Sequence, residues 1–424
     1  MRRRASATGA DTGSGTELSA GTHETGARGV AEAAVIHRRL AAFYFCFYGV
    51  LGAFLPYWAL WLAAEGLAPV QIGMVFGTLG LSRIVVPVVW GWLADRSGAP
   101  LQIVRVTGWL ATLCFAAMAA APDFHWMLAG VLAYAVFWHA CLPLYETVAL
   151  DHLQRTGYPY PRVRLWGSVG FVLAVVLIGA ALQSFSIRFL PVLIVGLMVA
   201  MTLSTYRLTA APRTQARDQA AAPLAQVLRQ PAVLALLAVC FLSQLSFAPY
   251  YGFFSVYLQA AGYSPLEIGG LWAWGVVAEI LIFLRTGDLL ARFGAGRILV
   301  LAMLSTGLRW GLLPAVLDSV GGLVVLQTLH LASFGLYHAA AIVLIRRYFA
   351  GALQSRGQAL YSAVSFGLGG ALGGYCSGWL WTRISPDGVF WLAALAGAVG
   401  ALIAYRWLCA AGLEPTPGHS DDIQ

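Results

Sequence analysis

The stretch Pro69-Val-Gln-Ile72-Gly73 occurs a second time, 196 positions later, as Pro265-Leu-Glu-Ile268-Gly269. The same offset relates a second set of positions, Gly91, Leu93, Arg96 and Gly98, to Gly287, Leu289, Arg292 and Gly294. Self-similarity at a fixed offset indicates that the chain contains two copies of one structural unit. In hydrophobic chains, paired units of this size are typical of proteins whose two halves enclose a site between them.

The composition of the chain points to a bilayer environment. Hydrophobic residues make up 59% of the 424 residues and charged residues 10%, against about 45–50% and about 25% in soluble domains. The net charge is +8, and all 26 basic residues are arginines. They lie in short gaps between apolar runs rather than on a basic face, which excludes nucleic acid as the expected partner. No Cys-x-x-Cys pair occurs, and we expect neither a metal nor a cofactor.

A helix needs about 20 apolar residues to cross the hydrocarbon core. The sequence contains twelve such runs, at approximately 37–64, 68–93, 103–121, 124–150, 163–183, 187–207, 231–260, 264–286, 296–315, 320–345, 355–382 and 387–408. We therefore predict an all-α polytopic membrane protein with twelve transmembrane helices, arranged as two pseudo-symmetric six-helix bundles.

The distribution of arginine predicts the orientation. The gaps after the even-numbered spans are arginine-rich, whereas the opposite gaps carry mainly acids, with Arg188 and Arg383 as exceptions. The positive-inside rule then places both termini in the cytoplasm. The predicted organisation is a disordered cytoplasmic tail (1–35), an N-terminal bundle (36–207), a cytoplasmic central loop (208–229), a C-terminal bundle (230–409) and a cytoplasmic tail (410–424).

Two groups of six spans with cytoplasmic ends and a central loop resemble the major facilitator superfamily. The specific mark is Gly91-Trp-Leu-Ala-Asp95-Arg96-Ser-Gly98, which is similar to that superfamily's signature between spans two and three. In the second copy Ala291 replaces the aspartate, and Asp288 is the expected substitute. The resemblance implies the major facilitator fold and a cytoplasmic gate, for which the candidate residues are Gly91, Asp95, Arg96, Glu146, Arg164, Asp288 and Arg292.

Within the superfamily the chain resembles the phenylpropionic acid permease group, which is related to the lactose permease and to nucleoside–proton symporters. The matching stretches are Phe54-Leu-Pro-Tyr-Trp58, Val163-Arg-Leu-Trp-Gly-Ser168, Tyr250-Tyr-Gly-Phe253, Gly275-Val-Val-Ala-Glu279, Arg309-Trp-Gly311, Gln327-Thr-Leu-His330 and Tyr361-Ser-Ala-Val364. This resemblance implies a proton-coupled transporter in the cell inner membrane that imports a small organic acid, with an aromatic, phenylpropionate-like acid as the leading candidate.

Placing an ionisable side chain within a membrane span costs about 2.5–3.5 kcal/mol of insertion free energy, so each such residue is a candidate functional residue. The deepest are Arg83, His139, Glu279, Arg309, His330 and His338. The lactose permease family has a glutamate in span eight, an arginine in span nine and a histidine in span ten. By that resemblance Glu279, Arg309 and His330 form the substrate- and proton-coupling group, and Arg83, His139 and His338 are further candidates. The family's additional acid in span ten is missing here, since Phe334 stands near that place, which leaves Glu279 as the candidate proton carrier.

Spans one and seven occupy matching positions in the two halves. Their aromatic residues Tyr57, Trp58, Tyr250, Tyr251 and Phe254 are candidates to line a substrate cavity, where ring stacking beside an arginine suits an aromatic carboxylate. Structural pairing of the buried charges, and anchoring of the aromatic rings at the membrane interface, are the alternative interpretations.

Other functions remain open at this point. A sugar or nucleoside proton symporter, or a drug efflux transporter, would have the same general pattern. A polytopic enzyme acting on lipid would need a nucleophile or a metal cluster, and a sensor would need an output domain; the sequence offers neither, so we predict that the chain is not an enzyme. The expected partners are a small-molecule substrate, protons and the lipid bilayer, and the expected state is a monomer.

Overall fold

The computed structural model describes residues 17–121, 123–209 and 224–409, and all regular structure within these ranges is helical. The first half contains α1 (Glu17–Ala64), α2 (Pro69–Ser97), α3 (Pro100–Ala119), α4 (Phe124–Thr156), α5 (Tyr160–Ser184) and α6 (Leu190–Ser204). The short helix α7 (Leu224–Leu228) precedes the second half. That half contains α8 (Pro231–Ala260), α9 (Pro265–Phe283), α10 (Thr286–Phe293), α11 (Ala295–Leu312), α12 (Val320–Thr328), α13 (Tyr337–Tyr348), α14 (Gln354–Ser362), α15 (Gly370–Arg383) and α16 (Pro386–Ala404).

Short helical segments complete several spans. Turns of 3-10 helix cover Ile187–Phe189, Thr205–Arg207, Pro314–Val316 and Gly351–Leu353, and π-helical segments cover Leu331–Leu336, Ala363–Gly369 and Tyr405–Cys409. Two of the π segments join α12 to α13 and α14 to α15, so that each pair forms one long helical path.

The described residues contain ten helices that are long and apolar enough to cross a membrane, or eleven if α10 and α11 count as one span bent by 113°. The predicted span 355–382 corresponds to the path from α14 to α15, whose many glycines and serines make it less apolar. Each of the twelve predicted runs thus has a helical counterpart, and the expected all-α membrane fold is confirmed.

The duplication is visible in the backbone. Gly66 and Gly262 have φ angles of 85° and 93°, and Gly98 and Gly294 have φ angles of 64° and 78°. Each pair is separated by the same 196 positions as the sequence repeat and lies at a helix end. A positive φ is accessible to glycine at little cost. The two copies therefore turn the chain in the same way at the same places.

The N-terminal segment begins its helix earlier than expected. We predicted disorder for residues 1–35, but α1 begins at Glu17, and residues 1–16 lie outside the described residues. Adding residues to an existing helix costs far less than starting one, which explains how the apolar span can extend backwards through an alanine-rich segment. Most of the predicted central loop and the predicted tail 410–424 also lie outside the described ranges.

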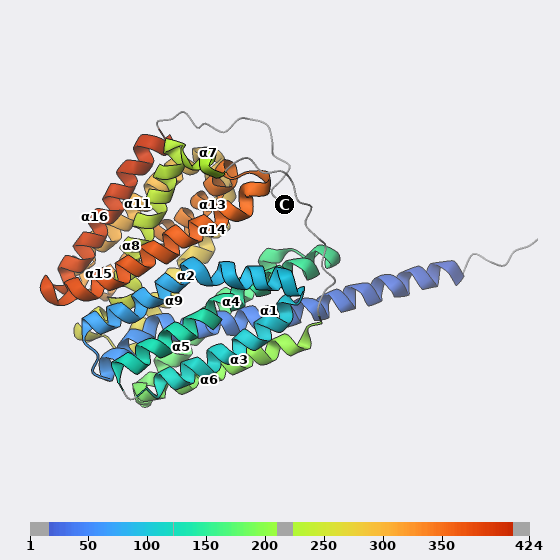
Figure 1. Cartoon of the computed structure of the whole chain (residues 1–424), viewed down its shortest axis with the longest axis horizontal. Helices are drawn as coiled ribbons and strands as arrows, with labels where there is room; N and C mark the ends of the chain where they lie inside the picture. Colours follow the sequence, from blue (N-terminus) through green and yellow to red (C-terminus); the bar gives the residue numbers. More distant parts are fainter. Residues whose placement is uncertain (1–16, 122, 210–223, 410–424) are drawn as a thin grey trace, which may run out of the picture.

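The two halves lie one against the other, with the first half coloured blue to green and the second yellow-green to red (Figure 1). They meet along two seams, α2 with α15 and α5 with α9. In the first seam a Cβ added to Gly73 would lie 2.7 Å from the carbonyl oxygen of Gly374. In the second, a Cβ added to Gly179 would lie 2.9 Å from the carbonyl oxygen of Pro265. Both seams lie near the starts of α2 and α9, on the side opposite the arginine-rich loops, so the halves are closed together at that end.

Candidate functional site

A cavity of about 170 Å³ lies between the two halves. Its walls come from α1, α2 and α4 of the first half and from α8, α15 and the π segment before α15 in the second. Six of its lining residues are aromatic, namely Phe54, Phe76, Tyr134, Trp138, Tyr251 and Phe366, and three more are strongly polar, namely Arg83, His139 and Gln244. None of the described residues that line the cavity carries a carboxylate.

Arg83 is the cation of this cavity. Its Nε donates to His139 Nε2 at 3.1 Å, and its guanidinium lies 5.8 Å from the centre of the Phe366 ring. Within the described residues, no Asp or Glu oxygen forms an ion pair with it. Arg83 is half-buried, and an arginine at membrane depth without a protein counter-ion is expensive. Such a cation is well suited to bind an anion that enters the cavity.

His139 holds Arg83 in place. The hydroxyl of Ser82 donates to the carbonyl oxygen of Leu79 at 2.8 Å, so its oxygen accepts a hydrogen bond from His139 Nδ1, also at 2.8 Å. The proton on Nδ1 leaves Nε2 free to accept from Arg83. This network assigns His139 as a neutral imidazole that orients the guanidinium.

A second polar cluster lies within the second half. Arg309 of α11 is 0% exposed and donates to Gln327 Oε1, to His330 Nδ1 at 2.8 Å and to Ser333 Oγ at 3.3 Å. His330 Nε2 lies 3.4 Å from Glu279 Oε2 on α9. Arginine can only donate, so His330 Nδ1 accepts and its Nε2 carries the proton that faces Glu279. The structure thus brings the predicted group of Glu279, Arg309 and His330 together, with His330 between the other two, and their role in coupling stays a prediction.

The backbone shapes this cluster. His330 immediately precedes the π segment Leu331–Leu336, and π segments within helices occur frequently at functional sites. Gly335 in that segment packs on Glu279, since a Cβ there would lie 3.3 Å from Glu279 Cγ. The glycine therefore makes room for the carboxylate side chain.

The predicted cavity aromatics have different surroundings. Tyr251 lines the cavity. Tyr250 packs instead on Arg309, with its ring centre 4.5 Å from the guanidinium, and Phe254 packs on Tyr250. Trp58 stacks on Trp61 within the first half.

The remaining predicted site residues lie away from the cavity lining. His338 Nδ1 lies 3.2 Å from the hydroxyl of Tyr361. Towards the end of α2, Arg96 lies over Trp92, and Gly91 and Asp95 lie in the same part of the helix. In α10, Asp288 lies in the first turn and Arg292 in the last turn, where it lies over Phe293. Glu146 accepts from the hydroxyl of Tyr160 at 3.1 Å, and Arg164 donates to the hydroxyl of Tyr48. A gating role for these residues stays a prediction.

Tyr57 is fully buried and lies at the seam between α5 and α9. Its hydroxyl donates to the carbonyl oxygen of Val175 at 2.7 Å and lies 3.3 Å from that of Pro265, in the other half. Gly269, the last residue of the repeated motif, leaves the space that this hydroxyl fills. The hydroxyl thus holds α1 to α5 within the first half, and its longer contact with Pro265 links this end to the second half.

Tyr57→Phe is expected to loosen this end. Only the longer contact with Pro265 crosses the seam, and its loss costs at most about 0.5–1.5 kcal/mol. The population in which the seam is open should therefore rise by a few-fold. Spin labels at positions 184 and 261, in a background without the native cysteines, would report longer distances by double electron–electron resonance. Tyr257→Phe is the matched control, since Tyr257 donates to Asp387 within the same half. Equal distance distributions for native and Tyr57→Phe proteins would refute the role.

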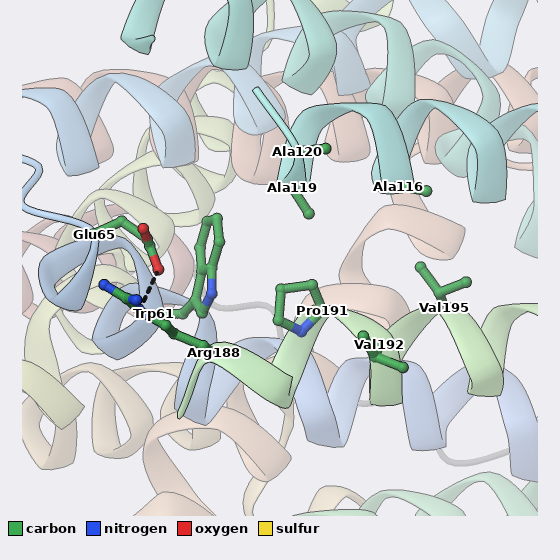
Figure 2. Close-up of a pocket in the computed structure, with 9 residues that line it drawn as sticks. All are labelled: Trp61, Glu65, Ala116, Ala119, Ala120, Arg188, Pro191, Val192 and Val195. Atoms are coloured by element: carbon green, nitrogen blue, oxygen red, sulfur yellow. Dashed lines mark ion pairs between the residues drawn. The ribbon is translucent and has the colours of Figure 1, made fainter. Parts of the chain in front are cut away.

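A larger and more open pocket, of about 550 Å³, lies elsewhere (Figure 2). Its lining includes Trp61, Glu65 and Arg188, and Arg188 Nε lies 3.6 Å from Glu65 Oε1. All of its lining residues belong to the first half. A substrate site that opens in turn to each side of the membrane lies between the two halves, because it is their relative movement that opens it. This pocket contacts only one half, so it is not the candidate substrate site.

Of the aromatic and strongly polar lining residues, the sequence predicted Arg83, His139 and Tyr251 as site residues. It did not predict the other described ones, namely Phe54, Phe76, Tyr134, Trp138, Gln244 and Phe366. The sequence does contain an indication for Gln244, because a polar amide in the middle of the apolar run 231–260 is unusual.

The comparison with protein families decides the classification. The model of the family described as "MFS_1 like family" matches residues 37–392. The chain belongs to this family of major facilitator transporters. It is 34% identical over 369 residues to the "Probable 3-phenylpropionic acid transporter" of Escherichia coli (strain K12), covering 84% of this chain and 94% of the relative. It is 27% identical over 371 residues to the maltose permease of Geobacillus stearothermophilus, covering 85% and 92%.

Solved structures agree on the fold. The crystal structure of the nucleoside transporter NupG matches with a TM-score of 0.72 at 17% identity, covering 89% of this chain and all of that one. The expected resemblance to the superfamily, to the phenylpropionic acid permease group and to nucleoside permeases is confirmed. The protein is thus a multi-pass membrane transporter of the major facilitator superfamily.

Proposed function

We propose that this transporter imports a small organic acid, with an aromatic phenylpropionate-like acid as the leading candidate, in symport with protons. The observation that carries the proposal is the cavity between the halves, where no described residue supplies Arg83 with a counter-ion and six aromatic rings contribute to the walls. An arginine grips a carboxylate through two parallel hydrogen bonds, and aromatic faces bind a ring with little loss of side-chain freedom.

The size of the cavity supports a compact substrate. An apolar cavity of about 150 Å³ is enough to bind benzene, and this cavity measures about 170 Å³. It suits one ring with a short acidic chain better than a disaccharide or a nucleoside. The name of the Escherichia coli relative supports the same substrate class.

Glu279 and His330 are the proposed proton site. Glu279 is the carboxylate of the second cluster, and the His330 Nε2 proton faces it. In the proposed cycle a proton neutralises Glu279, the acid binds beside Arg83, and the halves then rock about the cavity. Neutralising the carboxylate first lowers the cost of moving it through a closed, water-poor state.

We further propose the orientation and organisation predicted from the sequence. The chain would lie in the inner membrane with both termini in the cytoplasm, with bundles 36–207 and 230–409 joined by a cytoplasmic loop at 208–229. The state described here would then be closed to the outside, since the seams lie opposite the arginine-rich loops. A monomer suffices, because one chain supplies both walls of the cavity.

Uptake into vesicles tests this proposal. Reconstituted protein should accumulate labelled 3-phenylpropionate against its gradient when the outside is acidic, and a protonophore should abolish the accumulation. Protein-free vesicles must be measured in parallel, because the neutral acid crosses lipid unaided. Accumulation of a labelled nucleoside or of maltose, without 3-phenylpropionate, would overturn the substrate class in favour of the alternative symporters. Outward transport of the acid would instead indicate efflux.

A further inference from the structure

We infer that Gln244 is a substrate-binding residue and that it shares the substrate's carboxylate with Arg83, so that one oxygen-binding group comes from each half. This inference rests on the proposed function, because it names the atoms that hold an organic acid in the cavity.

The side-chain amide of Gln244 is buried and its nitrogen is unpaired among the described residues. The residue lies in the middle of α8, is 2% exposed and lines the central cavity. Its Nε2 has no hydrogen-bond partner among the described residues. Leaving a buried donor unpaired is costly, and nearly all such groups in proteins have partners. An acceptor that arrives with the substrate would supply the missing partner.

Arg83 offers the complementary charge on the opposite wall. Its Nε is already bonded to His139, and no described residue accepts from its two terminal nitrogens. The guanidinium therefore retains one edge for an anion in the cavity. Because Arg83 belongs to α2 and Gln244 to α8, a carboxylate bonded to both would tie the first half to the second.

Arg309 does not compete for this role. It is 0% exposed, it is absent from the cavity lining, and its terminal nitrogens already donate to Gln327, His330 and Ser333. The sequence analysis assigned substrate binding and proton binding to one group of residues, whereas the contacts favour two groups. Arg83 and Gln244 would bind the substrate's carboxylate, and Glu279 and His330 would bind the proton.

Tyr251 connects the two sites. It lines the cavity, and its ring centre lies 5.6 Å from that of Tyr250, which in turn covers Arg309. A ring bound in the cavity would contact Tyr251 and could thereby bias the packing around the proton cluster.

Calorimetric binding of 3-phenylpropionate to the purified full-length protein tests the assignment, with the neutral 3-phenylpropanamide as the comparison ligand. Gln244→Leu should raise the Kd for the acid about tenfold, and Arg83→Gln should raise it about a hundredfold, as expected for hydrogen bonds to a charged group. In both variants the ratio between the Kd for the amide and the Kd for the acid should be smaller than in the native protein. Ser246→Ala is the matched control, since Ser246 is a buried residue of α8 outside the cavity lining.

Thermal unfolding separates binding from a structural role. Without ligand, Gln244→Leu should be at least as stable as the native protein, because the unpaired amide is removed. The increase in Tm at a fixed concentration of 3-phenylpropionate should be smaller than for the native protein, because the Kd is higher. An unchanged Kd, or a lower Tm without ligand, would overturn the role of Gln244 while leaving acid transport intact. If the native protein binds a nucleoside or maltose but no carboxylate, the proposed function itself fails, and with it this assignment.

Discussion

Glu279→Gln is expected to abolish uphill accumulation of the substrate while leaving substrate exchange in place. The amide has nearly the shape of the carboxyl group but cannot take up or release the proton, so the variant resembles a permanently protonated carrier. His330 Nε2, which lies 3.4 Å from Glu279 Oε2, can still donate to the amide oxygen. Binding and rocking should continue, but the pH gradient should no longer drive net uptake.

Two assays on the same vesicles separate these outcomes. Accumulation under an inward proton gradient should fall to the level of protein-free vesicles, whereas counterflow of labelled against unlabelled substrate should remain near the native rate. Glu267→Gln is the matched control, since Glu267 lies on the same helix but is exposed and caps its start through Ser264. Native accumulation by Glu279→Gln would remove Glu279 from the coupling mechanism.

Arg309→Met is expected to unfold or severely destabilise the protein in addition to stopping transport. Arg309 is completely buried and holds Gln327, His330 and Ser333 together. Removing it leaves these polar groups without their donor, at about 1–3 kcal/mol for each buried group left unpaired. Arg309→Lys should not restore stability, because an ammonium cannot reproduce the planar fork of a guanidinium.

The measurement is thermal unfolding of detergent-purified protein without ligand. We expect a clearly lower Tm for both Arg309 variants and a native Tm for Arg292→Met, which removes an exposed arginine of α10. A native Tm for Arg309→Met would show that the cluster does not stabilise the second half. It would then be necessary to reconsider Arg309 as a substrate-binding group.

The sequence predicted the second cluster well because charge in an apolar span is rare and therefore conspicuous. That rarity marked six ionisable residues, and the resemblance to the lactose permease family selected Glu279, Arg309 and His330 among them. These three lie in contact as a chain of polar groups. The paired turns at Gly66 and Gly262 likewise follow from the repeat, because the same local sequence pattern produces the same backbone geometry.

The lining of the cavity could not be predicted in the same way. Tyr250 and Tyr251 are neighbours in one helix, and successive side chains point about 100° apart. Only the packing of α8 against other helices decides that Tyr251 lines the cavity while Tyr250 covers Arg309. Gln244 escaped notice because an amide carries no charge. Only the structure shows that its amide nitrogen has no hydrogen-bond partner among the described residues.

The two copies of the repeat differ in the residues that surround Arg83 and Glu279. Arg83 and Glu279 occupy equivalent positions, but Arg83 contacts His139, whereas the position equivalent to His139 is Gly335, which packs on Glu279. One copy thus presents a cation to the cavity, and the other holds a carboxylate beside a histidine. This difference is the structural basis for assigning the substrate's charge to Arg83 and the proton to Glu279.

Substrate-driven proton movement tests the central claim most directly. When 3-phenylpropionate is added to weakly buffered cells that contain the protein, the account predicts that the external medium becomes more alkaline than in cells without it, with one or more protons entering per substrate. Saturable uptake of the acid without any additional alkalinisation would contradict the account, because the acid would then cross without the proton that Glu279 is proposed to carry.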